Sequence, residues 1–273
     1  KKLGEQAVAT GHYCQRMGGE GQPYRLVAGA DPNKDQSYFL CQLSQEQLAQ
    51  AMFPIGHMQK PDVRRLAEQA GLPTAAKKDS QGLCFIGKVR LPEFLQQQLA
   101  VRQGNIVEID AVNPVFLRPQ DAVVEQRSQP FALAPEMGQV VGQHDGAHFF
   151  TVGQRKGLQV GGKAEPLFVI GTCTESNTVY VGQGDAHPGL HRNALELEAP
   201  HWVNPSHAFE APQSQSYELR IRYRQPLQEG ELVRTTEGRW FLDFGTHQRG
   251  IAAGQFATWY RDGELVGSAV IAR

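Results

Sequence analysis

The sequence predicts a protein of three parts: a mixed α/β region over residues 1–87, a small central α+β region over residues 88–163, and an all-β barrel over residues 164–273. In the first part, short apolar runs alternate with helix-start signals, which is typical of α/β folds. In the last part, apolar residues recur at every second position between turn dipeptides, which indicates a small barrel or sandwich.

The first part begins with a short strand followed by a helix. Residues 7–10 form an apolar run that predicts a buried strand ending in a loop. Ser44 and Gln47 have the spacing of a capping box, in which each side chain bonds the backbone N–H of the other residue. Leu43 and Leu48 flank this box as a hydrophobic staple does. A helix is therefore expected to start at Ser44.

A second helix is predicted after Pro61, whose missing N–H costs nothing in a first helical turn. Gly71 can end this helix in a left-handed cap. The apolar residues between them share one helical face. They are Val63, Leu66, Ala67 and Ala70.

The central part combines one helix and two strands with a long excursion. Residues 92–95 begin a predicted helix, and residues 105–108 and 139–141 read as strands. Between the strands, residues 110–137 are rich in Pro, Gln and Ala and have weak periodicity. We expect a long loop there and assign it no function.

The last part shows clear strand patterns. Residues 167–171 and 178–181 flank a turn, and Asp262-Gly263 is a strong hairpin signal. Residues 217–223 alternate between apolar and charged side chains, which predicts a half-buried strand. By parity this strand carries Arg220, Arg222 and Arg224 in one cationic row on a single face.

Composition limits the function classes. The chain has 273 residues, of which 40% are hydrophobic and 20% charged, and its longest apolar runs are too short to cross a bilayer. The formal net charge is −1. Any RNA partner must therefore be held by local basic patches, because phosphate contacts need clustered cations.

Cysteine usage indicates a reducing cytoplasm and no metal site. Cys14, Cys41, Cys84 and Cys173 stand far apart and include no C-x-x-C pair. This spacing argues against a structural zinc site and against a disulfide framework. Cys84 differs from the others because it follows a polar loop with Lys77 and Lys78, and nearby cations favour the reactive thiolate. On residue type alone, a buried structural cysteine is the more common alternative.

Five sequence words give the chain a specific resemblance. In order along the chain they are ATGHY at residues 9–13, NKDQSYFL at 33–40, KDSQGLCFIG at 78–87, TVGQRKGL at 151–158 and RYRQ at 222–225. The chain resembles bacterial tRNA-specific 2-thiouridylases over nearly its whole length. The resemblance implies that residues 1–87 are the C-terminal part of a PP-loop ATP-pyrophosphatase domain of the adenine nucleotide alpha hydrolase type. It also implies a central tRNA-binding domain and a C-terminal β-barrel.

The resemblance implies a two-step reaction. ATP, with Mg²⁺, adenylates the C2 oxygen of the wobble uridine, and a cysteine persulfide then delivers sulfur to C2. By position, Cys84 is the persulfide cysteine. The implied substrates are tRNAs for Glu, Gln and Lys, and the implied sulfur donor is a cysteine desulfurase or a relay protein.

The resemblance also transfers roles to individual residues. Gly11 corresponds to a glycine near ATP. The positions that correspond to tRNA contacts are His12, Lys34, Asp35, Gln36, Arg222, Tyr223 and Gln255. Taken alone, Gly11 is an ordinary strand-to-loop glycine and residues 34–36 a solvated turn. Tyr223 falls on the apolar strand face by parity, so it must reach RNA at a strand end or stay in the core. The basic loop at residues 154–157 is expected to face RNA backbone.

This chain lacks two parts of the family pattern, the SGGxDS phosphate loop and the second catalytic cysteine that follows it. We therefore expect a truncated form that alone neither hydrolyses ATP nor thiolates tRNA. Cys14 and Cys41 stand where the family needs no cysteine. Two alternatives are a non-catalytic tRNA-binding module and another ATP-pyrophosphatase-type enzyme such as argininosuccinate synthetase, which lacks this combination of words.

Overall fold

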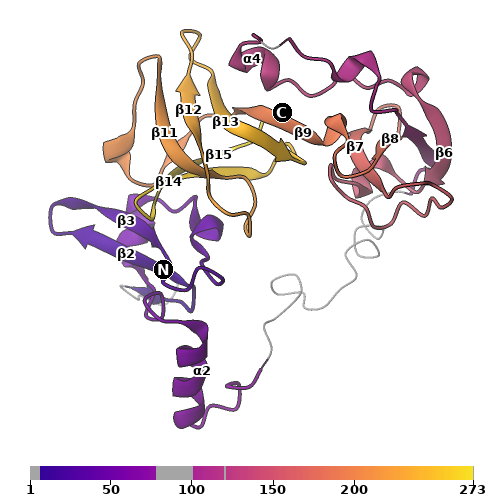
Figure 1. Ribbon diagram of the computed structural model, residues 1–273. Coiled ribbons are helices and arrows are strands. Elements are labelled where there is room, and N and C mark those ends of the chain that lie inside the picture. Colours follow the sequence, from indigo (N-terminus) through magenta and orange to yellow (C-terminus); the bar gives the residue numbers. More distant parts are fainter. Residues whose placement is uncertain (1–6, 78–100, 120, 273) are drawn as a thin grey trace. The chain divides into compact units, whose positions relative to one another are not determined.

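The computed structural model describes residues 7–77, 101–119 and 121–272 (Figure 1). These residues form two compact units. The first combines the described residues up to 77 with 196–245 and 253–272, and the second combines the described residues from 101 to 195 with 246–252. The first and last thirds of the sequence therefore fold together, which the sequence patterns did not predict.

The first strand pairs as a parallel two-stranded sheet. β1 (Val8–Ala9) lies beside β4 (Ala51–Met52), with Val8 opposite Ala51. The strand prediction for residues 7–10 is confirmed, but the predicted burial is wrong, because Val8 is 59% exposed. A two-stranded sheet leaves its faces open unless other elements cover them.

Both predicted helices of the first part are present. α1 (Gln45–Gln50) starts after Ser44, and both halves of the capping box with Gln47 are made. Leu48 is fully buried, and Leu43 packs against the same core cluster, as the staple predicts. α2 (Lys60–Gln69) has Pro61 in its first turn and is followed by Gly71 at φ +66°. No residue of α2 is buried.

The last part of the chain forms one long antiparallel sheet that includes a hairpin from the first part. The order is β2-β3-β15-β14-β11-β12-β13-β9, and β10 pairs with β15. The bounds are β2 Cys14–Gly19, β3 Gln22–Ala28, β9 His191–Leu197, β10 His201–Trp202, β11 Gln213–Arg220, β12 Gln228–Arg234, β13 Trp240–Arg249, β14 Phe256–Arg261 and β15 Glu264–Val270. The predicted all-β character is therefore confirmed. Within this sheet β9 is also joined to the chain at the end of β15, because Leu197 forms an isolated antiparallel bridge with Ile271.

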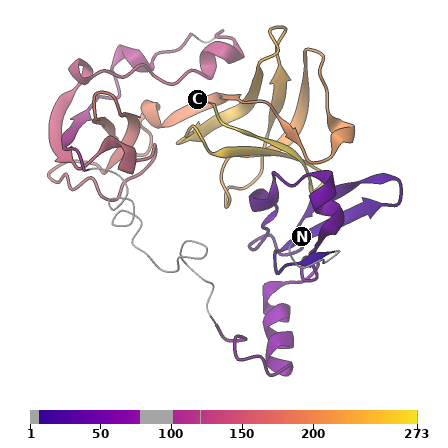
Figure 2. The same cartoon turned by 180° about the vertical axis from the view of Figure 1, so that it is seen from behind.

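A shared core explains why the β2–β3 hairpin joins this sheet. Leu26 of β3 lies opposite Leu265 of β15, and both are fully buried. Their core cluster also contains Leu48 of α1 and Tyr260 of β14. Figures 1 and 2 show the hairpin beside the barrel strands from both sides. Hydrophobic burial therefore fastens the first part of the chain to the last.

Two turns of this sheet bear on the predictions. Asp262 and Gly263 have φ angles of 51° and 76°, the conformation of a type I′ hairpin, and the predicted turn is confirmed. The predicted strand over residues 217–223 is too long, because β11 ends at Arg220. Gln225 closes a turn there, since its Oε1 accepts from the Ile221 N–H at 3.0 Å. Arg222 and Arg224 therefore do not continue the strand face of Arg220.

The second unit contains a four-stranded sheet in the order β6-β5-β8-β7. The bounds are β5 Gly104–Glu108, β6 Gln139–His144, β7 Leu167–Cys173 and β8 Thr178–Gln183. All four predicted strand segments are present. Because β7 and β8 pair here, the sheet does not divide at the predicted boundary of residue 163. The helix predicted at 92–95 lies outside the described residues.

The excursion at 110–137 is folded and packed. It contains η2 (Pro114–Phe116), α4 (Val124–Arg127) and η3 (Pro135–Met137). Phe116 is buried in a cluster with Val107 and Ile170. The segment therefore supplies core side chains to the second unit.

Candidate nucleic-acid interface

The loop that carries Lys34, Asp35 and Gln36 is held by a buried carboxylate. Asp35 is 6% exposed. Its oxygens accept from the Gly29 N–H at 3.1 Å, the Ser37 N–H at 3.0 Å and the Ser37 hydroxyl at 3.0 Å. A buried carboxylate needs such donors because desolvation of its charge is costly. These bonds position the short helix η1 (Ser37–Leu40).

Arg220 completes the environment of Asp35. Its Nη1 lies 3.2 Å from Asp35 Oδ2, and its side chain is only 12% exposed. The sequence patterns placed Arg220 in a cationic row with Arg222 and Arg224 on one strand face, and this prediction is wrong because β11 ends at Arg220. Ser37 Oγ also lies 3.0 Å from the Tyr260 hydroxyl. The loop is therefore fastened to the end of β11 and to β14.

Tyr38 connects η1 to the start of β14 and to the turn that follows β11. Its hydroxyl donates to the Phe256 carbonyl at 2.8 Å and lies 3.5 Å from the Ile221 carbonyl. Burial, with a smaller contribution from Cys41, raises the pKa of Tyr38 to about 12. The phenol therefore stays neutral and remains a donor at physiological pH. In the sequence, Gln255 directly precedes Phe256, and Tyr223 comes two residues after Ile221.

Two aromatic rings meet beside this junction, and we call Phe39 and Tyr223 the aromatic platform. Phe39 is 57% exposed, and its ring centroid lies 4.2 Å from that of Tyr223 at an interplanar angle of 40°. Arg224 is exposed, and its guanidinium carbon lies 5.7 Å from the Tyr223 ring centroid. Tyr223 thus lies in the turn after β11 and not within the strand. Of the two places that its parity allowed, it has the strand end and not the core.

Gln36 is bonded to Tyr13, the residue that follows His12 in the sequence. Gln36 Oε1 accepts from the Tyr13 N–H at 3.0 Å, and the Gln36 N–H donates to the Tyr13 carbonyl at 2.9 Å. His12 is half-buried, with Nδ1 2.9 Å from Thr10 Oγ1. Lys34 is half-buried in the same loop. The predicted tRNA residues of the first part therefore gather at one end of this loop.

The other predicted residues differ in what the structure says of them. Gln255 is exposed and Arg222 is half-buried. Gly11 is exposed, and an added Cβ there would meet only Ile55 Cδ1, at 3.9 Å, which is ordinary contact. The protein's own packing therefore does not demand glycine at this position. Cys84 lies outside the described residues.

The basic loop at residues 154–157 belongs to the second unit. Gln154 Nε2 donates to the Lys156 carbonyl at 2.8 Å, which closes the loop. Arg155 and Lys156 are exposed. Their predicted contact with RNA backbone stays a prediction.

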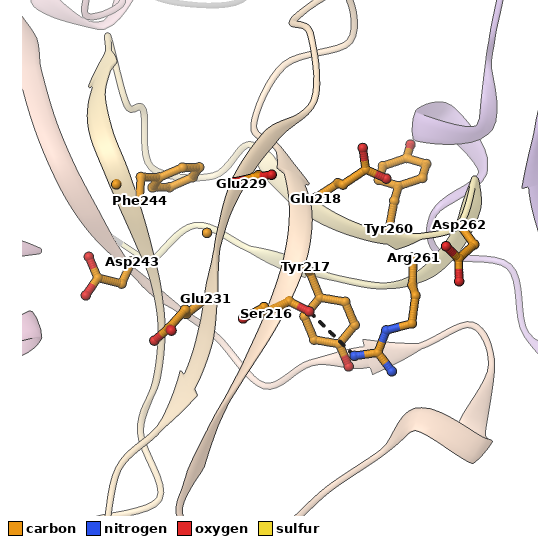
Figure 3. A pocket seen from close by; sticks show the side chains of 12 residues that line it. Ser216, Tyr217, Glu218, Glu229, Glu231, Asp243, Phe244, Tyr260, Arg261 and Asp262 are labelled. Atoms are coloured by element: carbon orange, nitrogen blue, oxygen red, sulfur yellow. Dashed lines mark hydrogen bonds between the residues drawn. The ribbon is translucent and has the colours of Figure 1, made fainter.

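A contrasting concave surface lies on the sheet itself, and we call it the acidic groove (Figure 3). Its volume is about 820 Å³. Its lining residues come from β11, β12, β13 and the β14–β15 hairpin, and those that carry a charge are Glu218, Glu229, Glu231, Asp243, Arg261 and Asp262. Five of these six are acidic. Phosphates are repelled by such a surface, so it is a poor candidate for RNA.

Phe39 is the residue that the sequence patterns missed at this interface, and Arg220 is one that they named without its partner Asp35. The signal for Phe39 was an aromatic pair, Tyr38-Phe39, directly after the polar residues 33–37. Within the described ranges, no three His, Cys, Asp or Glu side chains are placed to hold a metal. No helix in those ranges is long and apolar enough to cross a membrane.

Comparison with known proteins gives a family for the whole chain. Family models match as a tRNA methyl transferase HUP domain at residues 1–88, a tRNA methyl transferase PRC-barrel domain at 123–183 and an aminomethyltransferase beta-barrel domain at 192–271. The chain is 51% identical to the tRNA-specific 2-thiouridylase MnmA of Flavobacterium johnsoniae, covering 98% of this chain and 71% of that protein. The corresponding protein of Christiangramia forsetii is 50% identical with the same coverage. That of Karelsulcia muelleri is 38% identical over 97% of this chain and 69% of the relative. The chain therefore belongs to the tRNA-specific 2-thiouridylase family.

Proposed function

We propose that this chain supplies the tRNA-binding surface and the sulfur-carrying thiol of an ATP-dependent tRNA 2-thiouridylase. The observation that carries the proposal is the meeting of the family's tRNA positions around η1. Asp35 and Arg220, 185 residues apart in sequence, bring the loop of residues 34–36 to the turn of residues 222–225. Those two segments contain most of the positions to which the family resemblance assigns tRNA contacts.

The proposed reaction at the uridine uses two reagents, ATP and a cysteine persulfide. ATP, when bound, supplies the adenylyl group that converts the C2 oxygen into a leaving group. The open space over Gly11 is consistent with a nucleotide near this glycine. Mg²⁺ has no set of three ligands among the described residues, so the proposal assigns none of them to the metal.

Cys84 carries the sulfur in this proposal. Its persulfide presents a terminal sulfur that attacks C2 as the adenylated oxygen leaves with AMP. A second thiol then cleaves the S–S bond, which leaves sulfur on the base and a disulfide between the two cysteines. In the family, that second cysteine lies upstream of the ATGHY word.

Two other thiols of the chain are unsuited to this role. Burial, followed by the charge of Asp35, raises the pKa of Cys14 to about 12. Burial also raises the pKa of Cys41. Cys173 differs, because hydrogen bonds from the side chain and backbone of Ser176 lower its pKa. It is therefore the natural internal control for Cys84.

Persulfide mapping tests the carrier role on this chain. The chain is incubated with a cysteine desulfurase and cysteine, alkylated, digested and analysed by mass spectrometry. We expect a persulfide on the Cys84 peptide in the wild type and in Cys173→Ser, and none in Cys84→Ser. Sulfur on Cys173 alone, or on no cysteine, contradicts the proposal.

The remaining proposals follow from the substrate. The tRNAs proposed are those for Glu, Gln and Lys, and the proposed location is the cytoplasm, where these tRNAs act. A non-catalytic tRNA-binding module of the same architecture is the competing function. It predicts tRNA binding with no sulfur on Cys84, so persulfide mapping also separates the two functions.

A further inference from the structure

We propose that the aromatic platform of Phe39 and Tyr223 is a stacking site for an unpaired base of the bound tRNA. The inference rests on the proposed function and assigns a role to Phe39, which the family resemblance did not. Proteins that bind single-stranded RNA commonly stack bases on aromatic rings and hold the backbone with nearby cations. The surface around η1 has both features.

The exposure of Phe39 needs a reason. Phenylalanine is among the residues most often buried, yet this side chain is 57% exposed on a short helix. Its one face is covered, because its ring packs against Tyr223 at 4.2 Å between centroids. A flat base placed on the exposed part of this ring pair would bury the remaining apolar surface.

The platform is held rigidly before any ligand arrives. The Phe39 N–H donates to the Gln36 carbonyl at 3.0 Å. Its neighbour Ser37 is fully buried between Asp35 and Tyr260, and Tyr38 bonds the Phe256 carbonyl. A preorganised surface loses little conformational entropy on binding, so more of the stacking free energy appears as affinity.

The charges beside the platform favour RNA over a protein partner. Arg224 is exposed, and its guanidinium carbon lies 5.7 Å from the Tyr223 ring centroid. A guanidinium in this position can bond a phosphate while it stacks on a ring. Arg222 and Lys34 add cationic side chains to the same two segments. A purely apolar protein contact has no need for this combination.

Binding of the unmodified anticodon stem-loop of a glutamate tRNA, followed by fluorescence anisotropy, tests the platform. Phe39→Ala is expected to weaken binding roughly 5- to 100-fold, the range for loss of one base–aromatic stack. Phe39→Trp is expected to restore it, because a larger ring stacks at least as well. Leu66→Ala is the matched control, since Leu66 is another large apolar side chain that is 50% exposed, on α2.

Salt dependence separates stacking from phosphate contact. The slope of log affinity against log salt should stay unchanged in Phe39→Ala, because no counterion is released by a ring. In Arg224→Gln the slope should fall by about 0.7 to 0.9. A reduced slope in Phe39→Ala would mean that the ring acts only by placing cations.

Each outcome decides a separate question. Wild-type binding that Phe39→Ala changes by less than twofold overturns the platform and leaves the proposed function standing. No binding by the wild type at low salt overturns both. If Phe39→Ala loses affinity that Phe39→Trp does not restore, and its melting temperature falls, then the ring is structural. Loss of desulfurase binding with unchanged tRNA affinity assigns the surface to a protein partner and overturns the platform.

Discussion

The aromatic platform and the acidic groove both adjoin strand β11, but they have opposite chemistry. The platform follows the end of the strand, where Arg224 and the Phe39 ring are exposed and the Tyr223 ring is half-buried. The groove lies along the strand, where Glu218 faces Glu229 directly across to β12. The net charge of −1 for the whole chain does not reveal this separation of cationic and acidic surfaces. Local charge placement, and not overall charge, therefore decides where RNA can bind.

The two regions also differ in how their charges are compensated. Beside the platform, the buried Asp35 is paired with Arg220, whose side chain is 12% exposed. In the groove, Glu231 of β12 lies opposite Asp243 of β13, so carboxylates face each other across the strands. Like charges in directly opposed positions destabilise a sheet slightly.

The largest expected effect comes from breaking the ion pair between Asp35 and Arg220. Arg220→Ala leaves the buried Asp35 carboxylate without its cation and should lower the free energy of unfolding by about 3 kcal/mol, the lower end for a broken buried pair. The lower end applies because three backbone and hydroxyl donors remain on Asp35. Urea denaturation measures the loss.

The exposed pair of Arg65 and Asp62 provides the control for this prediction. Its side chains are 67% and 42% exposed, so Arg65→Ala should cost less than about 0.5 kcal/mol. The double variant Asp35→Asn, Arg220→Met should recover part of the stability, because no charge stays unpaired. An equal loss of unfolding free energy in Arg220→Ala and Arg65→Ala would contradict the burial of the Asp35–Arg220 pair.

A smaller effect is expected from Tyr38→Phe, which keeps the ring and removes the hydrogen bond to the Phe256 carbonyl. At neutral pH the loss should be about 1 kcal/mol. The folded-state pKa of Tyr38 is raised from 10.0 to about 12, so the folded protein holds the phenol proton more tightly than the unfolded chain. That stabilisation is present below pH 10 and is lost as pH rises from 10 towards 12.

Stability curves of both proteins check this sign. The wild type should lose unfolding free energy more steeply between pH 10 and 12 than Tyr38→Phe does. Cys14 and Tyr260 also have raised pKa values, but they titrate in both proteins, so the difference reports Tyr38. Parallel curves would show that Tyr38 is not buried as described.

Local signals in the sequence predicted local structure correctly. The Ser44 and Gln47 capping box and the Asp262-Gly263 hairpin depend on residues within a few positions of each other, and both are present. The same reasoning placed strands at 105–108 and 139–141. What periodicity did not reveal was the end of β11, because a side-chain bond from Gln225 stops the strand where alternation continues.

The arrangement of the site depends on contacts distant in sequence. The sequence placed Arg220 in a cationic row of one strand, whereas in the fold it is paired with Asp35. Phe39 had no assigned role in the sequence, and its contact with the Tyr223 ring appears only in the folded chain. The sequence motifs shared with the family marked several residues of the interface, but they did not predict the Asp35–Arg220 pair or the aromatic platform. Those follow from the shared core of the first and last parts of the chain.

Photo-crosslinking of tRNA tests the contrast between platform and groove most directly. A glutamate tRNA with 4-thiouridine in its anticodon loop is irradiated with the wild-type chain, and crosslinked peptides are identified by mass spectrometry. We predict crosslinks in peptides that contain Phe39 or residues 222–225. Crosslinks confined to residues 229–243 of the acidic groove, with none at the platform, would contradict the central claim.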